Sequence, residues 1–288
     1  MYYVLYALNG LLMLGMPLLL GVIIARRGKV RWGLFAVGAA TFVGAQVLHI
    51  PFNFLVERTG LLPAAGAGTA SLLVLSLFYG LSAGVFEEGA RYIVFRRWAK
   101  RARSWWQGLM VGVGHGGIEA MLLGLLFVVN MAVLIGVQSG RFTELMPPDA
   151  LPDIEEQVAA LFSVPWYETL LGALERLFAL TVHLAMSLLV LLGVVRRQVR
   201  WLGAAILWHT LLDAVAVFTI QQWGVYVAEA AIGVFAVLSL LIIFALRDEF
   251  PSAPDDSIVE ITEEMAPSPD GTIVVEQSSE RLDESRFD

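Results

Sequence analysis

Residues 105–137 read WWQGLMVGVGHGGIEAMLLGLLFVVNMAVLIGV. Within this stretch only His115 and Glu119 can ionise, and most of the other residues are apolar or small. A helix needs about 20 mainly apolar residues to cross the hydrocarbon core of a bilayer, and this stretch exceeds that length. It therefore predicts a membrane-spanning helix that carries two ionisable groups inside the bilayer.

The rest of the chain has the same character. Its 288 residues are 58% hydrophobic and 16% charged, far more apolar than a soluble domain. The predicted spans are Tyr2–Ala25, Trp32–Val56, Thr69–Phe95, Trp105–Val137, Trp166–Val195, Trp201–Ile220 and Val225–Leu246. The predicted fold class is all-α, a polytopic membrane helix bundle of about seven transmembrane helices. The absence of cysteine excludes disulfides, thiolate metal ligands and a cysteine nucleophile.

The loops between the spans predict how the chain is oriented, because short cytoplasmic loops carry an excess of Lys and Arg. The basic residues follow the first, third and fifth spans: Arg26, Arg27, Lys29, Arg31, Arg96, Arg97, Lys100, Arg101, Arg103, Arg196, Arg197 and Arg200. We therefore expect the N-terminus outside and the C-terminus in the cytoplasm. No basic residue precedes the apolar run that starts at Tyr2, so we expect the first span to be retained rather than cleaved as a signal peptide.

Two domains are expected. Residues 1–246 would form the bundle, with an outer loop of residues 138–165, and residues 247–288 would form an acidic cytoplasmic tail. The tail is rich in Ser, Pro, Asp and Glu, which predicts disorder. In the outer loop, Asp153 with Glu156 predicts the capped start of a short helix. The apolar face of that helix would consist of Ile154, Val158, Leu161 and Phe162.

Several ionisable residues fall inside the predicted spans, where each costs about 2.5–3.5 kcal/mol at a helix centre. They are Glu87, Glu88, Arg91, His115, Glu119, Glu175, Arg176, His183, His209 and Asp213. Counting about 1.5 Å per residue from the basic loops places Glu88, His115 and His209 at roughly 12–15 Å depth, with His183 and Asp213 slightly deeper. Four different spans are thus expected to supply one polar layer. His49 is expected to lie towards the outer end of its span, away from this layer.

Residues three or four apart lie on one face of a helix, and the polar layer contains several such pairs. The pairs are Glu87–Arg91, Glu88–Arg91, His115–Glu119 and His209–Asp213. A carboxylate behind an imidazole fixes its tautomer and raises its basicity, as expected for a metal ligand or a catalytic base. Glycines at 112, 114, 116 and 117 flank His115 and would allow either close helix packing or the approach of a ligand.

Each of these features also has a purely structural interpretation. The alternatives are an ion pair that snorkels to the cytoplasmic face for Glu87, Glu88 and Arg91, a hydrogen bond that joins the bundle for His209–Asp213, and an interhelical hydrogen bond for His183. Glu175 and Arg176 are expected to form a structural pair.

Three motifs favour the functional interpretation: EEGAR at 87–91, GHGGIEA at 114–120 and HTLLD at 209–213. Together they resemble the YhfC-type membrane peptidases, relatives of the CAAX-protease and bacteriocin-processing (CPBP) and PrsW families. The resemblance implies cleavage of a peptide bond at membrane depth, with the double glutamate and the histidines as the catalytic or metal-binding centre. It also implies a prokaryotic cell membrane. Asp213, where CAAX-type relatives often carry Asn, follows the YhfC branch.

The function predicted from these residues is that of an intramembrane endopeptidase, a hydrolase of the metalloprotease or glutamate type. One glutamate, preferentially Glu88, is expected to activate water, because two adjacent carboxylates in a low dielectric cannot both ionise cheaply. Arg91 would orient that carboxylate. The candidate catalytic residues are Glu87, Glu88, Arg91, His115 and His209. The candidate ligands of a divalent metal such as zinc are His115, His209, His183, Glu119 and Asp213, and the histidines could instead hold the oxyanion.

The expected partners are a membrane-embedded or membrane-adjacent peptide substrate and the lipid bilayer, with no nucleic acid. Two other functions fit similar residues. An ion-coupled transporter also lines a cavity with Glu, His and Asp at membrane depth, although the sequence lacks the repeated halves with interrupted helices that are typical of such proteins. A non-catalytic membrane scaffold with the same fold is the third possibility.

Overall fold

The computed structural model describes residues 1–141 and 151–251. Within these residues the elements are α1 (Tyr2–Gly28), α2 (Gly33–Arg58), α3 (Thr69–Arg97), α4 (Trp105–Gln138), α5 (Leu151–Ser163), the 3₁₀ turn η2 (Trp166–Leu170), α6 (Leu171–Val195), α7 (Arg200–Trp223), α8 (Val225–Ala245) and the 3₁₀ turn η3 (Arg247–Glu249). In the described part of the chain, seven helices are long and apolar enough to span a membrane, and α6 does so together with η2. The all-α membrane bundle expected from the sequence is confirmed.

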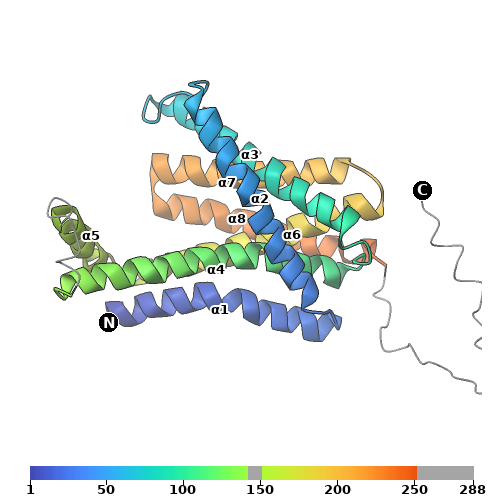
Figure 1. Ribbon diagram of the computed structural model, residues 1–288, viewed down its shortest axis with the longest axis horizontal. Coiled ribbons are helices and arrows are strands. Elements are labelled where there is room, and N and C mark those ends of the chain that lie inside the picture. Colours follow the sequence, from blue (N-terminus) through green and yellow to red (C-terminus); the bar gives the residue numbers. More distant parts are fainter. Residues whose placement is uncertain (142–150, 252–288) are drawn as a thin grey trace, which may run out of the picture. The chain divides into compact units, whose positions relative to one another are not determined.

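The central element of the bundle is α6. In the most apolar 18-residue stretch of its span, 72% is buried inside the protein, whereas the same share in the other spans is 22–33%. It contacts α1, α3, α4, α7 and α8, so most of the bundle is built around it. In Figure 1, α1 and α4 run side by side, whereas α2 slants across the bundle in contact with α3 and α4. The outer surfaces of the spans carry many exposed Leu, Ile, Val and Phe side chains, as expected where lipid is the solvent.

The helices approach one another most closely at glycines. A Cβ atom added to Gly38 of α2 would lie 2.1 Å from the carbonyl oxygen of Val111, and one added to Gly114 of α4 would lie 2.1 Å from that of Phe35. The same applies to α3 and α7, where a Cβ on Gly80 would lie 2.6 Å from the Thr210 carbonyl oxygen. Small residues let helix backbones come close enough for van der Waals packing in lipid. The glycines around His115 therefore pack helices.

Substituting Gly38 tests this packing. The change Gly38→Ala should destabilise the protein by about 1–3 kcal/mol, because the new methyl group meets backbone that cannot move without shifting α4. Gly44 on the same helix has nothing within 4 Å of an added Cβ, so Gly44→Ala is the matched control. The control should be neutral or slightly stabilising, since Ala is a better helix former than Gly. Thermal unfolding of both variants in detergent measures the difference, and equal melting temperatures would contradict the proposed contact.

The short helix of the outer loop is α5, and its predicted apolar face is confirmed: Val158 is buried, and Ile154, Leu161 and Phe162 are half-buried. The predicted cap is wrong, because Asp153 lies inside the helix, which extends to Leu151. The end of α5 is tied to α1, since the Tyr6 hydroxyl donates to the Leu161 carbonyl oxygen at 2.7 Å.

One compact unit covers Met1–Ala253, and near its end Phe250 is buried and Glu249 pairs with Arg196. The remaining unit, Pro254–Asp288, lies outside the described residues, as does the predicted disorder of the tail. The orientation of the termini and the division at residue 246 stay predictions.

Candidate functional site

Four helices bring their ionisable side chains together inside the bundle. Helix α3 supplies Glu87, Glu88 and Arg91, α4 supplies His115 and Glu119, α6 supplies Glu175, Arg176 and His183, and α7 supplies His209 and Asp213. The rings of His115 and His183 have centroids 5.4 Å apart, and those of His183 and His209 are 5.7 Å apart. All residues that the sequence singled out for the site therefore lie in one connected group.

Glu87 is at the centre of this group. Its Oε2 atom lies 2.9 Å from Nε2 of His115, and 4.0 Å from both Nε2 of His209 and the guanidinium of Arg91. Donor atoms of Glu87, His115 and His183 all lie within 4.8 Å of one another, and all three residues are buried. One carboxylate and two imidazoles gathered in this way could hold a single metal ion.

Glu88 and Arg91 form an ion pair next to Glu87, and both side chains are fully buried. One guanidinium nitrogen of Arg91 donates to Oε1 of Glu88, and the other lies 2.7 Å from Nδ1 of His183. Oε1 of Glu88 also accepts from Nδ1 of His209 at 2.8 Å. Because these charges point into the bundle and towards histidines, the alternative of an ion pair that snorkels to the membrane surface is wrong.

The two carboxylates predicted to stand behind histidines do so in different ways. Asp213 lies 3.3 Å from Nε2 of His209 on the same helix, as the spacing predicts. Glu119 does not bond to His115; its Oε2 atom instead lies 2.7 Å from Nε2 of His183 on the neighbouring α6. Arg176 donates to the other oxygen of Glu119 at 2.7 Å and also pairs with Glu175. The predicted Glu175–Arg176 pair is therefore present and also supports Glu119.

These contacts determine which ring nitrogens carry protons when no ion is bound. Arg91 can only donate, so Nδ1 of His183 accepts and its Nε2–H donates to Glu119. Both ring nitrogens of His209 face carboxylate oxygens, so both act as N–H donors. His115 differs, because its Nδ1 atom is buried without a hydrogen-bond partner among the described residues. A buried polar atom without a partner is uncommon and calls for a functional explanation.

A cavity of about 100 Å³ adjoins the group, and it is large enough to hold water. Its walls are formed by Glu87, Glu119, Glu175, Arg176, Ala179, His183, His209, Leu212, Asp213, Ala216 and Ile232. Glu87 lines this cavity, whereas Glu88 does not. Of the two adjacent glutamates, a reactant in the cavity would therefore meet Glu87.

The residues present fit a divalent metal. Catalytic zinc sites commonly use three N or O ligands from the protein and leave one position for water. Glu87, His115 and His183 supply such a set, and the unpartnered Nδ1 of His115 leaves that ring without a competing hydrogen bond on this nitrogen. Of the other predicted ligands, Glu119 contacts His183 and His209 lies 4.0 Å from Glu87, whereas Asp213 contacts His209.

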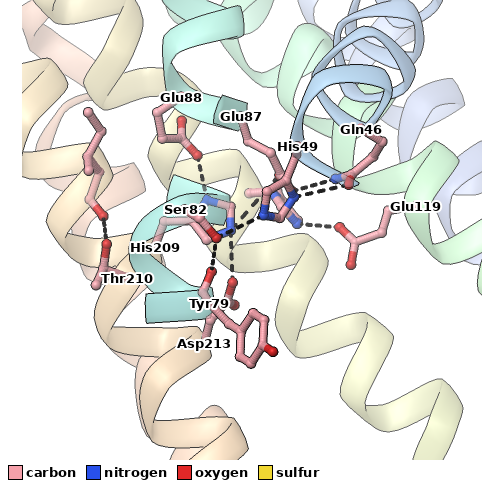
Figure 2. A network of polar contacts seen from close by, with 12 residues as sticks. Gln46, His49, Tyr79, Ser82, Glu87, Glu88, Glu119, His209, Thr210 and Asp213 are labelled. Atoms are coloured by element: carbon pink, nitrogen blue, oxygen red, sulfur yellow. Dashed lines mark hydrogen bonds and ion pairs between the residues drawn. The ribbon is translucent and has the colours of Figure 1, made fainter. Parts of the chain in front are cut away.

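Sequence reasoning missed Gln46 and set His49 aside. Nε2 of Gln46 donates to Oε1 of Glu87 at 2.9 Å, and His49 lies next to Gln46 (Figure 2). The expectation that His49 stands apart from the layer is thus wrong. A signal was present, because Gln46, His49 and Asn53 form a polar row at spacings of three and four within an otherwise apolar span.

Comparison with known proteins gives the site its family context. The family described as YhfC intramembrane metalloprotease matches residues 12–247. The chain belongs to the YhfC family. It is 34% identical over 242 residues to the uncharacterised membrane protein YhfC of Bacillus subtilis (strain 168), a match that covers 81% of this chain and 90% of that protein. No solved structure matches the chain. Like that YhfC protein it is an integral membrane protein, and the match with a Bacillus protein points to a prokaryotic cell membrane.

The matched region contains every element of the buried group, from α2 to α7. The description of the YhfC family implies a membrane protease that uses a divalent metal, and the buried Glu87, His115 and His183 are residues of this chain that could bind one. The description names neither the metal nor the substrate.

Proposed function

We propose that this protein is an endopeptidase that hydrolyses a peptide bond of a membrane-embedded or membrane-adjacent substrate. The observation that carries the proposal is the buried set of Glu87, His115 and His183 beside a polar cavity among helices long and apolar enough to span the membrane. Ionisable groups are expensive in the bilayer and mark functional sites there. The family description supports the same reaction class.

Glu87 is the residue proposed to activate the water. The sequence favoured Glu88, but Glu88 does not line the cavity and already accepts hydrogen bonds from Arg91 and His209. A carboxylate at the cavity wall can accept a proton from water while the water oxygen attacks the carbonyl carbon of the substrate. Glu87 then returns that proton to the leaving amine nitrogen, which completes the hydrolysis.

The other residues hold the reacting groups in place. His209 lines the cavity, and its Nε2–H, which faces Asp213 at 3.3 Å, would donate instead to the oxyanion that develops on the substrate. Glu88 fixes the ring of His209 through Nδ1, and Arg91 balances the charges of the two adjacent glutamates. These roles make Glu88 and Arg91 positioning residues.

Glu87, His115 and His183 would hold the divalent ion through one ligand atom each, which leaves the second oxygen of Glu87 to accept the proton of the water. We propose zinc because one carboxylate and two imidazoles suit it. When bound, such an ion supplies Lewis-acid polarisation of the carbonyl and makes a bound water easier to deprotonate. Glu119 orients His183 through the Nε2 atom of that ring in the ion-free geometry, with Arg176 holding Glu119.

The experiment that tests this function uses the purified full-length protein in liposomes with a library of membrane peptides. We expect cleavage by the wild type, its loss on chelation and its recovery when zinc is returned. The double variant His115→Ala, His183→Ala should contain less than about one tenth of the wild-type metal, whereas His209→Ala should keep most of it. Metal content is measured by elemental analysis. Ion flux without any cleavage would favour a transporter instead, and equal metal content in the double variant would refute the proposed ligands.

A further inference from the structure

A line of hydrogen bonds runs along α2 and ends on Glu87. Gln46 donates through Nε2 to Oε1 of Glu87 at 2.9 Å. Nδ1 of His49 lies 3.2 Å from Oε1 of Gln46, and Nε2 of His49 lies 2.9 Å from Nδ2 of Asn53. Figure 2 shows His49 and Gln46 side by side next to Glu87. None of these three α2 residues belongs to the motifs that point to the reaction.

The carboxylate at the end of this line sets the direction of the hydrogen bonds that follow from it. The carboxylate of Glu87 accepts, so the amide nitrogen of Gln46 must face it and the amide oxygen must face His49. In the neutral ring Nδ1 of His49 is then the protonated nitrogen, which leaves Nε2 to accept from the amide of Asn53. A flipped Gln46 would place its carbonyl oxygen against a carboxylate, and the Nδ1–H of His49 opposes that flip.

The ring of His49 is itself held by the helix that carries the glutamates. It stacks on Phe86 with centroids 5.5 Å apart and an interplanar angle of 29°. Oγ of Ser82 lies 3.0 Å from Nε2 of the same ring. Phe86 directly precedes Glu87 in the sequence, so α3 positions both the ring of His49 and the carboxylate at the end of the line.

We propose that Gln46 is a positioning residue for Glu87 and that His49 acts through Gln46 by fixing its amide orientation. This inference rests on the proposed role of Glu87 and adds two residues to it. The Glu side chain has three rotatable bonds, and one donor on Oε1 leaves Oε2 facing His115. Outer hydrogen bonds of this kind typically contribute 10–100-fold to metal affinity or activity.

The experiment compares substitutions that keep or remove one donor. Gln46→Leu removes the amide at similar size, and we expect zinc affinity and kcat to fall by about 10–100-fold with little change in KM. Gln221→Leu, the same change at an exposed position of α7, should leave both unchanged. Zinc affinity is measured by competition with a chelating dye, so one readout does not depend on cleavage.

At His49 two variants separate packing from hydrogen bonding. His49→Phe keeps a ring to stack on Phe86 but removes the donor, and we expect it to approach the defect of Gln46→Leu. His49→Asn loses the ring but keeps an N–H close to the position of Nδ1, and it should recover a large part of the loss. Because His49 acts through Gln46, the double variant Gln46→Leu, His49→Phe should be no worse than Gln46→Leu alone. Equal defects in His49→Phe and His49→Asn, or additive defects in the double variant, would overturn the role of His49.

Nitrogen NMR of histidine-labelled protein separates this inference from the proposed function. We expect neutral His49 with its proton on Nδ1 in the wild type, and a changed signal in Gln46→Leu. A proton on Nε2 in the wild type would overturn the inference whether or not the protein cleaves peptides. A third outcome combines the expected tautomer and a lower zinc affinity in Gln46→Leu with no cleavage of any peptide. In that case the positioning role of Gln46 stands and the proposed protease activity fails. Unchanged zinc affinity and kcat in Gln46→Leu would also overturn the positioning role of Gln46.

Discussion

The variant Glu87→Gln is expected to lose peptide cleavage by at least about 100-fold, the usual range for removing a general base being 10²–10⁴-fold. The amide keeps the size of the carboxylate but can neither accept a proton from water nor supply a negative ligand to a metal. In the wild type, Gln46 and His115 both donate to the carboxylate oxygens of Glu87. In the variant, the new NH₂ group would face one of these two donors. The measurement is the rate of product formation by purified protein in liposomes.

A matched control is Glu57→Gln, because Glu57 is exposed at the end of α2 and bonds to Tyr79 rather than to the buried group. This control should cleave at the wild-type rate. Glu88→Gln provides the second comparison, and we expect a smaller loss than in Glu87→Gln, since Glu88 does not line the cavity. A larger loss in Glu88→Gln would return the role of base to Glu88, and full activity in Glu87→Gln would refute the mechanism.

The spans could be predicted closely because hydropathy alone determines them. The predicted fourth span, Trp105–Val137, corresponds to α4 at Trp105–Gln138, and the predicted third span, Thr69–Phe95, to α3 at Thr69–Arg97. In lipid every backbone group must be bonded within the segment, so a long apolar stretch has little choice but to be a helix. The start of α5 was misjudged because its outer-loop sequence lacks this constraint.

The partners within the polar layer were harder to predict than its membership. The spacing of His115 and Glu119 predicts that they share a face of α4, but it does not say which neighbouring helix comes closer. A Cβ atom on Gly116 would lie 2.6 Å from Cδ2 of His183, so α6 approaches α4 at this point. His183 therefore reaches Glu119, and His115 turns to Glu87 instead. Such contacts depend on how the helices cross, and the residue spacing along one helix gives no information about that crossing.

Gln46 and His49 were missed because depth was counted along the chain. A helix that slants, as α2 does in Figure 1, advances less than 1.5 Å per residue across the membrane. A residue that counting places near the outer end can then lie beside the layer. The polar row of Gln46, His49 and Asn53 was the usable signal, since polar side chains in a membrane span face protein rather than lipid.

The variant Arg91→Met is expected to be the most destabilising single change at the site. Arg91 is fully buried and faces Glu88, Glu87 and His183. Removing one partner of a buried ion pair typically costs about 3–5 kcal/mol, because the remaining charge stays in a low dielectric without compensation. We expect a lower melting temperature in detergent and no cleavage. Arg96→Met on the same helix is the control, since Arg96 is exposed and should change stability by less than about 0.5 kcal/mol.

A double variant shows whether the uncompensated charge is the cause. Glu88→Gln, Arg91→Met removes both charges of the pair, so it should be more stable than Arg91→Met alone even though it carries one more substitution. Cleavage should stay absent, because Nδ1 of His209 then faces a neutral amide and the adjacent Glu87 has lost its cation. If the double variant were as unstable as the single one, the loss would come from packing around Arg91. If Arg91→Met were as stable as Arg96→Met, the guanidinium would not be compensating buried carboxylates, and the charge balance proposed for Glu87 and Glu88 would have to be abandoned.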